Sequence, residues 1–245
     1  MGDKSAIEWT NSTWNPTTGC SKVSPGCDNC YAKTFAHRLQ KMGVSRYAGG
    51  FELALHEDVL GLPLKWKKPR MIFVDSMSDL FHESIPLEFV DRVFGTIERA
   101  PQHIYQVLTK RSRLMLDYSE RVGGFPDCVW AGVSVEDARY KFRIDHLRNV
   151  GARIRFLSIE PLLGPVDELD LSGIHWVIAG GESGTNSRPV DPDWLREVRD
   201  QCIARDIPFF FKQWGGRTPK SGGRTLDGRI WNEFPRKEDT CRVPP

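Results

Sequence analysis

The sequence lacks the features that would assign it to a class at once. No apolar run approaches the roughly 18 residues that cross a bilayer, and the first residues, MGDKSAIEWTNSTW, hold no apolar signal core. A P-loop, an HExxH motif and a Ser-His-Asp order are missing. The formal net charge is only +2, which neither requires nor excludes a nucleic-acid partner. We therefore expect a cytoplasmic globular protein that has no membrane partner.

Cysteine is scarce, yet half of it is concentrated in one place. The chain has 6 cysteines, and Cys20, Cys27 and Cys30 fall together in GCSKVSPGCDNCYA, residues 19–32. Thiols stay reduced in the cytosol, where clustered cysteines indicate metal binding or catalysis more often than disulfides. The spacing therefore predicts a metal site.

Three thiols suit some metals better than others. A structural zinc ion needs four protein ligands, and His37 is the nearest candidate for the fourth, although it falls inside a predicted helix. A 4Fe–4S cluster held by three thiolates leaves one iron open for a small molecule. In radical S-adenosylmethionine chemistry that iron binds S-adenosylmethionine, and one electron then yields a 5′-deoxyadenosyl radical. We predict such a cluster on Cys20, Cys27 and Cys30, with S-adenosylmethionine as the second cofactor.

Apolar runs that alternate with amphipathic stretches predict the fold class. Val-, Ile-, Phe- and Trp-rich runs read as buried strands near 7–17 and at 71–81, 104–111, 129–136, 154–164, 174–184 and 208–216. Helical patterns occupy 31–42, 86–99, 136–150 and 192–205, the last with Asp191 as its N-cap and Pro192 at its first position. The alternation predicts an α/β fold with a parallel sheet.

The sheet can be an open doubly wound sheet or a parallel (β/α) barrel. No GxGxxG follows the first strand, polar residues end nearly every strand, and no single switch point stands out. These observations favour a partial or full barrel of about six to seven strands. Residues 1–216 form the predicted barrel domain, and residues 217–245 form a C-terminal tail packed on it.

Several motifs in order carry a resemblance to a known family. The stretches are IEWTNSTWNPTTGCSKVSPGCDNCYA, FVDSMSDLFHE, QVLTKR, WAGVSVE, FLSIEPLLG, AGGESG, FKQWGG and LDGRIWNEFP. Together they resemble the phage three-cysteine-motif family, which is similar to radical S-adenosylmethionine enzymes in its cysteine cluster and partial barrel. The usual spacing in those enzymes is Cys-x3-Cys-x2-Cys, whereas six residues separate the first pair here.

The polar strand ends are the candidate binding residues. Asp75, Ser76, Ser78 and Asp79 follow the second strand and offer acceptors for the methionine ammonium group. Ser134 and Glu136 suit ribose hydroxyls, and Glu160 ends the fifth strand. The resemblance implies that Gly180, Gly181 and Glu182, after the sixth strand, lie near the adenine. Lys110, Arg111, Lys212 and Gln213 are candidate substrate contacts.

Basic runs and tryptophans leave the substrate open. KWKKPR (65–70) and TKRSR (109–113) are short basic runs, and the chain has 8 tryptophans. Basic residues before a strand are commonly a solvated face, so a nucleic acid is a candidate substrate because of the resemblance to a phage-borne family rather than because of charge. The radical chemistry requires an external electron donor. One alternative is a zinc-stabilised nucleic-acid-binding protein without catalysis. Another keeps the cluster for electron transfer or for a repair reaction like that of spore photoproduct lyase.

Overall fold

The computed structural model describes residues 5–218 and 221–236. Its helices are α1 (Tyr31–Lys41), α2 (Leu87–Glu98), α3 (Ser112–Val122), α4 (Phe142–Asn149) and α5 (Pro192–Ile203). Its longer strands are β1 (Ser12–Trp14), β4 (Met71–Val74), β5 (Ile104–Thr109), β6 (Val129–Ser134), β7 (Ile154–Ile159), β8 (Trp176–Gly180) and β9 (Phe209–Gln213). Two-residue strands are β2 (Thr17–Thr18), β3 (Ala54–Leu55), β10 (Thr225–Leu226) and β11 (Arg229–Ile230).

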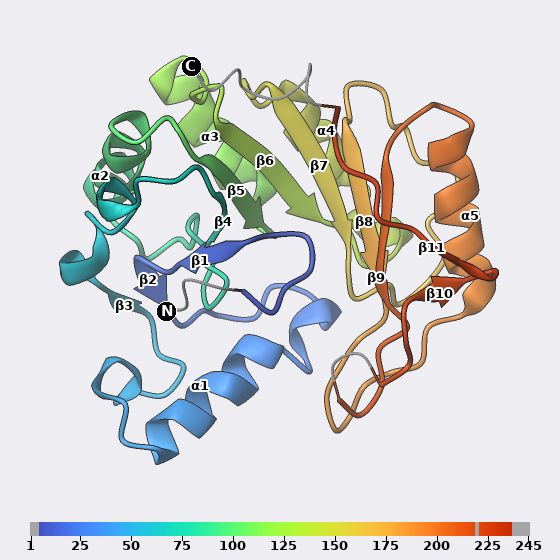
Figure 1. The fold of residues 1–245 in the computed structure, drawn as a ribbon, viewed down its shortest axis with the longest axis horizontal. Coiled ribbons are helices and arrows are strands. Elements are labelled where there is room, and N and C mark those ends of the chain that lie inside the picture. Colours follow the sequence, from blue (N-terminus) through green and yellow to red (C-terminus); the bar gives the residue numbers. More distant parts are fainter. Residues whose placement is uncertain (1–4, 219–220, 237–245) are drawn as a thin grey trace.

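The longer strands form one parallel sheet in the order β1-β4-β5-β6-β7-β8-β9 (Figure 1). Each strand lies next to the strand that follows it in this series, as expected for successive right-handed crossovers. Within the described residues β9 does not pair with β1, so the barrel is open. The predicted α/β fold with a partial parallel barrel of seven strands is confirmed.

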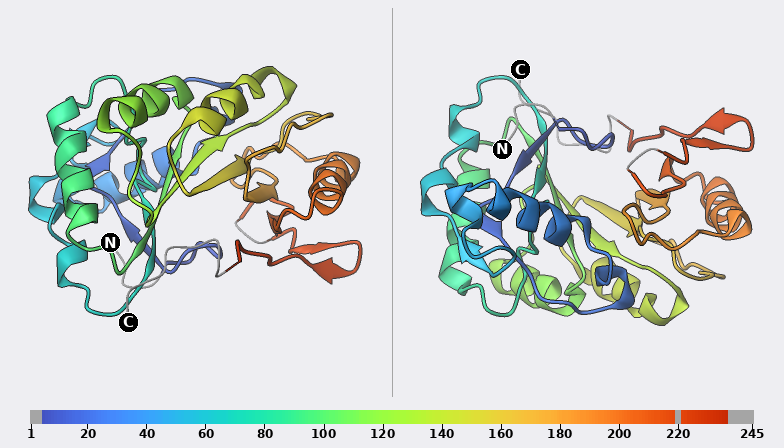
Figure 2. Two further views of the ribbon diagram at one scale, coloured as in Figure 1. Left: turned by 90° about the horizontal axis from the view of Figure 1, so that it is seen from above. Right: turned by 90° about the horizontal axis from the view of Figure 1, so that it is seen from below.

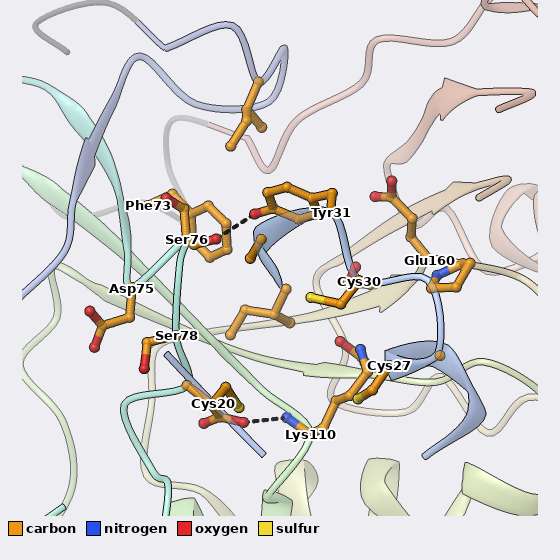
Figure 3. A pocket seen from close by; sticks show the side chains of 18 of the residues that line it. Cys20, Cys27, Cys30, Tyr31, Phe73, Asp75, Ser76, Ser78, Lys110 and Glu160 are labelled. Carbon is orange, nitrogen blue, oxygen red and sulfur yellow. Dashed lines mark hydrogen bonds between the residues drawn. The ribbon is translucent and has the colours of Figure 1, made fainter. Parts of the chain in front are cut away.

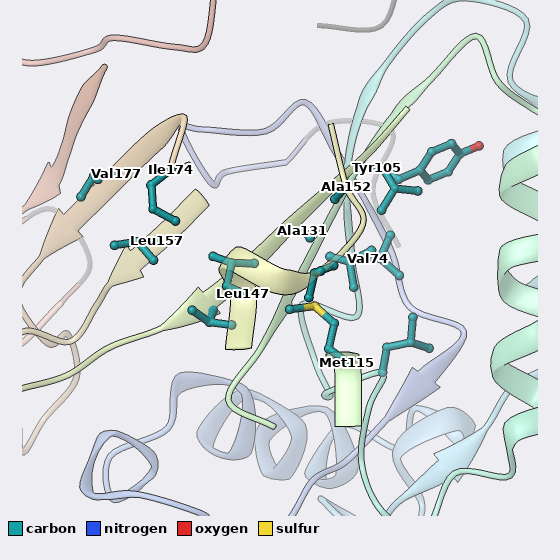
Figure 4. Close-up of a cluster of buried hydrophobic side chains, with 14 of the residues drawn as sticks. Val74, Tyr105, Met115, Ala131, Leu147, Ala152, Leu157, Ile174 and Val177 are labelled. Carbon is teal, nitrogen blue, oxygen red and sulfur yellow. The ribbon is translucent and has the colours of Figure 1, made fainter. Parts of the chain in front are cut away.

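Side chains of the central strands alternate between two apolar cores. In β6, Ala131 and Val133 belong to the outer core, between the sheet and the helices (Figure 4), whereas Trp130 belongs to the inner one. The inner core is rich in aromatic rings, and its members are Trp9, Phe73, Trp130, Ile154, Phe156, Trp176, Ile178 and Phe210. Burial on both faces explains why these strands are apolar throughout.

Contacts of Trp9 measure how strongly the sheet curls. Its ring centroid lies 4.7 Å from that of Phe73 on β4 and 6.4 Å from that of Trp176 on β8. In a flat sheet these strands would be about 19 Å apart, at about 4.8 Å per strand. One indole can reach both only because the sheet is rolled, so the segment before β1 fills the concave side.

Two helices match their sequence signals. α5 starts at Pro192, and the Asp191 side chain accepts a hydrogen bond from the Asp193 backbone N–H, which confirms the predicted cap. α2 starts one residue after Pro86 and buries Val90, Phe94 and Ile97 of the predicted apolar stripe, whereas its first member, Leu87, is 53% exposed. The helices lie on the convex side of the curved sheet, apart from α1 (Figure 2).

Helices α1 and α3 depart from the sequence prediction. The helical pattern of residues 31–42 predicts an apolar stripe of Tyr31, Phe35, Leu39 and Met42. Phe35 and Met42 are 47% and 66% exposed, and Ala32 and Ala36 are buried instead. Small residues allow the closer approach to the loops beneath, so the alanine face packs. α3 was not predicted, because its first turn lies within the basic run TKRSR.

The C-terminal segment packs on β9 through its aromatic residues. Leu226 and Trp231 are buried in the outer core, and the backbone N–H of Phe211 donates to the Trp231 carbonyl at 3.0 Å. The described part of the predicted tail therefore covers the edge of the sheet, while residues 237–245 lie outside the described residues. No described helix is long and apolar enough to span a membrane.

Replacing Trp9 tests the curled sheet. Trp9→Ala should lower the free energy of unfolding by about 3–5 kcal/mol, because its ring bridges distant strands and is 3% exposed. Chemical denaturation measures the loss. Leu87→Ala, at an apolar side chain that is 53% exposed on α2, is the control and should change stability by less than about 0.5 kcal/mol. Equal effects of the two variants would contradict the packing described here.

Candidate active site

The three clustered cysteines lie on the segment between β2 and α1, which we call the cysteine loop (residues 19–30). It contains one short 3-10 turn, Pro25–Cys27, and Cys30 directly precedes α1. Cys20, Cys27 and Cys30 all line one cavity of about 360 Å³ at the carboxyl ends of the parallel strands (Figure 3). All three thiols are half-buried.

Most of the predicted site residues meet in this cavity. Besides the cysteines, it is lined by Asp75, Ser76, Ser78, Asp79, Lys110, Arg111, Ser134, Glu160, Glu182, Lys212 and Gln213. Three of the predicted residues, Glu136, Gly180 and Gly181, do not line it. Gly181 serves chain packing instead, because a Cβ there would lie 2.0 Å from the Trp214 carbonyl oxygen.

Arg111 holds the first cysteine of the loop. Its Nη1 donates to Cys20 Sγ at 3.4 Å and to Asp79 Oδ2 at 3.2 Å. Its Nη2 donates to Ser21 Oγ at 2.7 Å. Burial, followed by the nearby Asp79 charge, raises the pKa of the Cys20 thiol to about 11, although Arg111 opposes the shift. Without a metal this thiol is therefore protonated at neutral pH, and metal binding would release its proton.

Glu136, two residues after the end of β6, holds the middle of the loop. It is fully buried, and its Oε1 accepts a hydrogen bond from Ser24 Oγ at 2.6 Å. Arg143 donates to its Oε2 at 2.8 Å, and the Lys110 ammonium lies 3.4 Å from its Oε1. Gly26 packs so closely that a Cβ there would lie 2.6 Å from the carboxylate. Glu136 thus supports the loop from behind and does not line the cavity.

Glu182, after β8, holds the end of the loop together with Arg188. Its Oε2 accepts from Asn29 Nδ2 at 2.9 Å and from the Arg188 backbone N–H at 3.0 Å. Arg188 also donates from its side chain to the Pro25 carbonyl at 2.9 Å and pairs with Asp28 at 3.4 Å. Burial alone would raise the pKa of Glu182, but hydrogen bonds from Arg188 and Asn29 hold it below its ordinary value.

The turn after β4 forms the wall beside Cys20 and Cys30. The Thr17 backbone N–H donates to Asp75 Oδ1 at 2.9 Å, and burial raises the pKa of Asp75 to about 8. Asp75 has a φ of 54°, a left-handed conformation that aspartate and asparagine tolerate better than most residues. Ser78 Oγ donates to the Gly19 carbonyl at 2.6 Å, and Tyr31 donates to the Ser76 carbonyl at 2.5 Å.

The opposite wall carries an ion pair inside the cavity. Lys212 Nζ lies 2.5 Å from Glu160 Oε1, and both side chains are less than a fifth exposed. Gln213 on the same strand donates to the Gly181 carbonyl at 3.3 Å. The cavity therefore offers an amine, a carboxylate and thiols around a largely apolar interior.

The partners that hold the cysteine loop carry no sequence signal for that role. Ser24 and Asn29 lie within the cysteine loop, but no motif links them to Glu136 and Glu182. Arg143 and Arg188 likewise act through contacts between segments far apart in the chain. Tyr31, which the helical pattern of residues 31–42 places on an apolar stripe, also forms part of the cavity wall.

No single-ion site is formed by these side chains. Among residues 5–218 and 221–236, no three His, Cys, Asp or Glu side chains come close enough together to bind one metal ion. His37 is exposed, and its Nδ1 lies 3.5 Å from Gln40 Oε1 rather than beside the cysteines.

A family model described as "Protein of unknown function (DUF5131)" matches residues 4–235. The chain belongs to this family. No curated protein matches this DUF5131 chain. Its fold is similar to a solved spore photoproduct lyase complexed with dinucleoside spore photoproduct, at 14% identity and a TM-score of 0.43 over 76% of this chain. A double mutant of that lyase, with bound AdoMet and the same dinucleoside, gives 12% identity and 0.43 over 77%. The DUF5131 chain covers 58% and 60% of these two structures.

Gly26→Ala tests the attachment of the cysteine loop to β6. The new methyl group would collide with the Glu136 carboxylate, so the loop should move away at a cost of about 1–3 kcal/mol. Thiol-reactive dye should then label Cys27 and Cys30 several times faster than in the wild type. Gly61→Ala, where the new Cβ would lie 3.9 Å from Leu64 Cδ1, is the matched control. Unchanged labelling in Gly26→Ala would show that Glu136 does not hold the loop.

Asp75→Asn tests the raised pKa. Because the folded pKa lies above that of the unfolded chain, the native state binds the extra proton between about pH 4 and pH 8. Wild-type stability therefore falls as the pH rises through this window, and the uncharged variant escapes that loss. Relative to wild type, Asp75→Asn should gain more than about 1 kcal/mol between pH 4.5 and 8.5 in chemical denaturation.

The exposed Asp127→Asn provides the matched control for this pH comparison, and it should follow the wild-type curve. Parallel curves for wild type and Asp75→Asn would mean that the Asp75 carboxyl ionises normally.

Proposed function

We propose that the protein is an iron–sulfur enzyme of the radical S-adenosylmethionine type that acts on a nucleic acid. One observation carries the proposal: Cys20, Cys27 and Cys30, from a single loop, line one cavity at the carboxyl ends of the parallel strands. Enzymes with parallel α/β sheets collect their chemistry at this edge. A cavity of about 360 Å³ is in the range of small-molecule sites and leaves room for a cofactor beside the thiols.

The donor set supports a cluster better than a single zinc ion. Zinc–sulfur bonds of about 2.3 Å in a tetrahedral site bring thiolates to about 3.8 Å from one another. A cubane binds each thiolate to a different iron and accepts wider spacing. The described residues form no one-ion group, and His37 lies away from the loop. The zinc-stabilised nucleic-acid-binding protein therefore gains no support from this geometry.

The residues of the cavity fit the two cofactors by their chemistry. When bound, the cluster and S-adenosylmethionine would supply a one-electron cleavage that produces a 5′-deoxyadenosyl radical. We assign the acceptors of the turn after β4 to the methionine ammonium group and Ser134 to the ribose. Glu160 and Lys212, on the opposite wall, would contact substrate. Arg111, Glu136 and Glu182 would orient the thiols by holding the cysteine loop.

Two further parts of the proposal follow from the chemistry and the resemblance. An external donor must supply the electron, because the described residues include no second group of clustered cysteines. A nucleic-acid substrate is consistent with the resemblance to the phage three-cysteine-motif family. The working compartment would then be a reducing cytoplasm, where thiolate ligands survive.

Cysteine variants test the proposal in protein prepared without oxygen. Wild type reconstituted with iron and sulfide should hold one 4Fe–4S cluster, and its electron paramagnetic resonance signal should change when S-adenosylmethionine is added. With a strong reductant it should form 5′-deoxyadenosine, measured by mass spectrometry. Cys20→Ala, Cys27→Ala and Cys30→Ala should lose nearly all cluster and product.

Cys202→Ala, on α5 and away from the cavity, serves as the control and should retain both. If protein with a fully loaded cluster never forms 5′-deoxyadenosine, the enzyme proposal is wrong. One equivalent of zinc in anaerobically purified protein would favour the alternative without catalysis.

A further inference from the structure

Helix α1 carries a face that stays largely exposed. Tyr31, Phe35, Arg38 and Met42 follow one another at helical spacing and so share one side, which we call the α1 track. Tyr31, Phe35 and Met42 are 49%, 47% and 66% exposed. The neighbouring side of the helix, with Ala32 and Ala36, packs against the protein. Three exposed apolar side chains gathered on one side of a helix make that side a candidate binding surface.

The α1 track is continuous with the cavity. Tyr31, at its start, lines the cavity and donates to the Ser76 carbonyl, while Met42 lies about 16 Å further along the helix axis. In the view from below, α1 lies across the front of the molecule (Figure 2). A ligand that enters the cavity can therefore extend along the helix without leaving protein surface.

The positive charge of α1 favours an anionic ligand. The helix has no acidic residue, and its exposed Lys33, Arg38 and Lys41 make no ion pair within the described part of the chain. Inside the cavity the cations are already paired, Arg111 with Asp79 and Lys212 with Glu160. An anionic ligand would therefore find its free cations on α1 rather than in the cavity.

We propose that single-stranded nucleic acid binds along the α1 track and delivers one nucleotide to the cavity. Unstacked bases would lie on the rings of Tyr31 and Phe35, and phosphates would meet Arg38 and Lys41, the combination that single-strand-binding surfaces use. A single strand fits better than a duplex because only unpaired bases expose their faces for stacking. The inference rests on the proposed function in taking the cavity as the reaction site.

Binding of a 12-nucleotide, fluorescein-labelled oligothymidylate, followed by fluorescence anisotropy, tests the surface. Phe35→Ala should weaken binding about 5- to 150-fold, the usual loss of one base–aromatic stack. Arg38→Ala/Lys41→Ala should lower the slope of log affinity against log salt by about 1.4, the value for two lost phosphate contacts on a single strand. A duplex of the same length should compete poorly.

Two control variants match these changes elsewhere on the surface. Phe142→Ala removes a ring that is 50% exposed on α4, and Lys67→Ala/Lys68→Ala removes two exposed cations from the run before β4. Both should bind the oligonucleotide like wild type. If the control and track variants lose affinity equally, or neither does, the assignment of the α1 track is overturned.

Two other partners would also overturn it. Phe35-dependent sedimentation with phosphatidylserine vesicles, without oligonucleotide binding, would make the α1 track a membrane-binding face. Slower reduction of the variants by an acidic electron-transfer protein, with unchanged oligonucleotide affinity, would make it a docking site for the electron donor. The binding assay needs no cluster. If oligonucleotide binding fails while 5′-deoxyadenosine still forms, only the assignment of the α1 track is rejected. If binding depends on the α1 track but no 5′-deoxyadenosine forms, the proposed function is rejected instead.

Discussion

The arrangement of the site depends on how one irregular loop is fastened to the ends of the strands. The cysteine loop has only a single short turn of regular structure, so little within it fixes the directions of its thiols. Three charged groups fix them from outside: Arg111 after β5, Glu136 after β6 and Glu182 after β8. Buried charges cost several kcal/mol of desolvation unless they are paired and hydrogen-bonded, and each of these three is. Such contacts are directional, so they determine the geometry of the loop more than they add to stability.

The sequence predicted the sheet well because the relevant signal is local. Strands buried on both faces must be apolar throughout, and each such run stands out without knowledge of its neighbours. Helix α5 was found for a similar reason, since Asp191 and Pro192 mark its start on their own. The face of α1 could not be found in this way. Its large apolar side chains suggested burial, but the packing is decided by the small Ala32 and Ala36, which admit the closest approach.

The membership of the site was predictable for a topological reason, and its contacts were not. In a parallel sheet the carboxyl ends of all strands reach the same edge, so polar residues that end strands converge wherever they lie in the chain. This explains why Asp79, Ser134 and Glu160 line one cavity with the cysteines. Which atoms each residue contacts depends on loop paths that no short motif records. Glu136 and Gly26 are an example, because the Glu136 carboxylate fits only where residue 26 has no side chain.

The ion pairs at the strand ends affect how ligands reach the cavity. Lys110, Arg111 and Lys212 face carboxylates at 3.4, 3.2 and 2.5 Å, so their fields largely cancel a short distance away. The cavity can recognise groups at contact range but attracts little from solution. Long-range attraction of an anionic ligand must then come from cations that have no such partners, and α1, which starts at the cavity with Tyr31, carries Lys33, Arg38 and Lys41. Recognition at contact range and capture from solution are thus separated between the strand ends and helix α1.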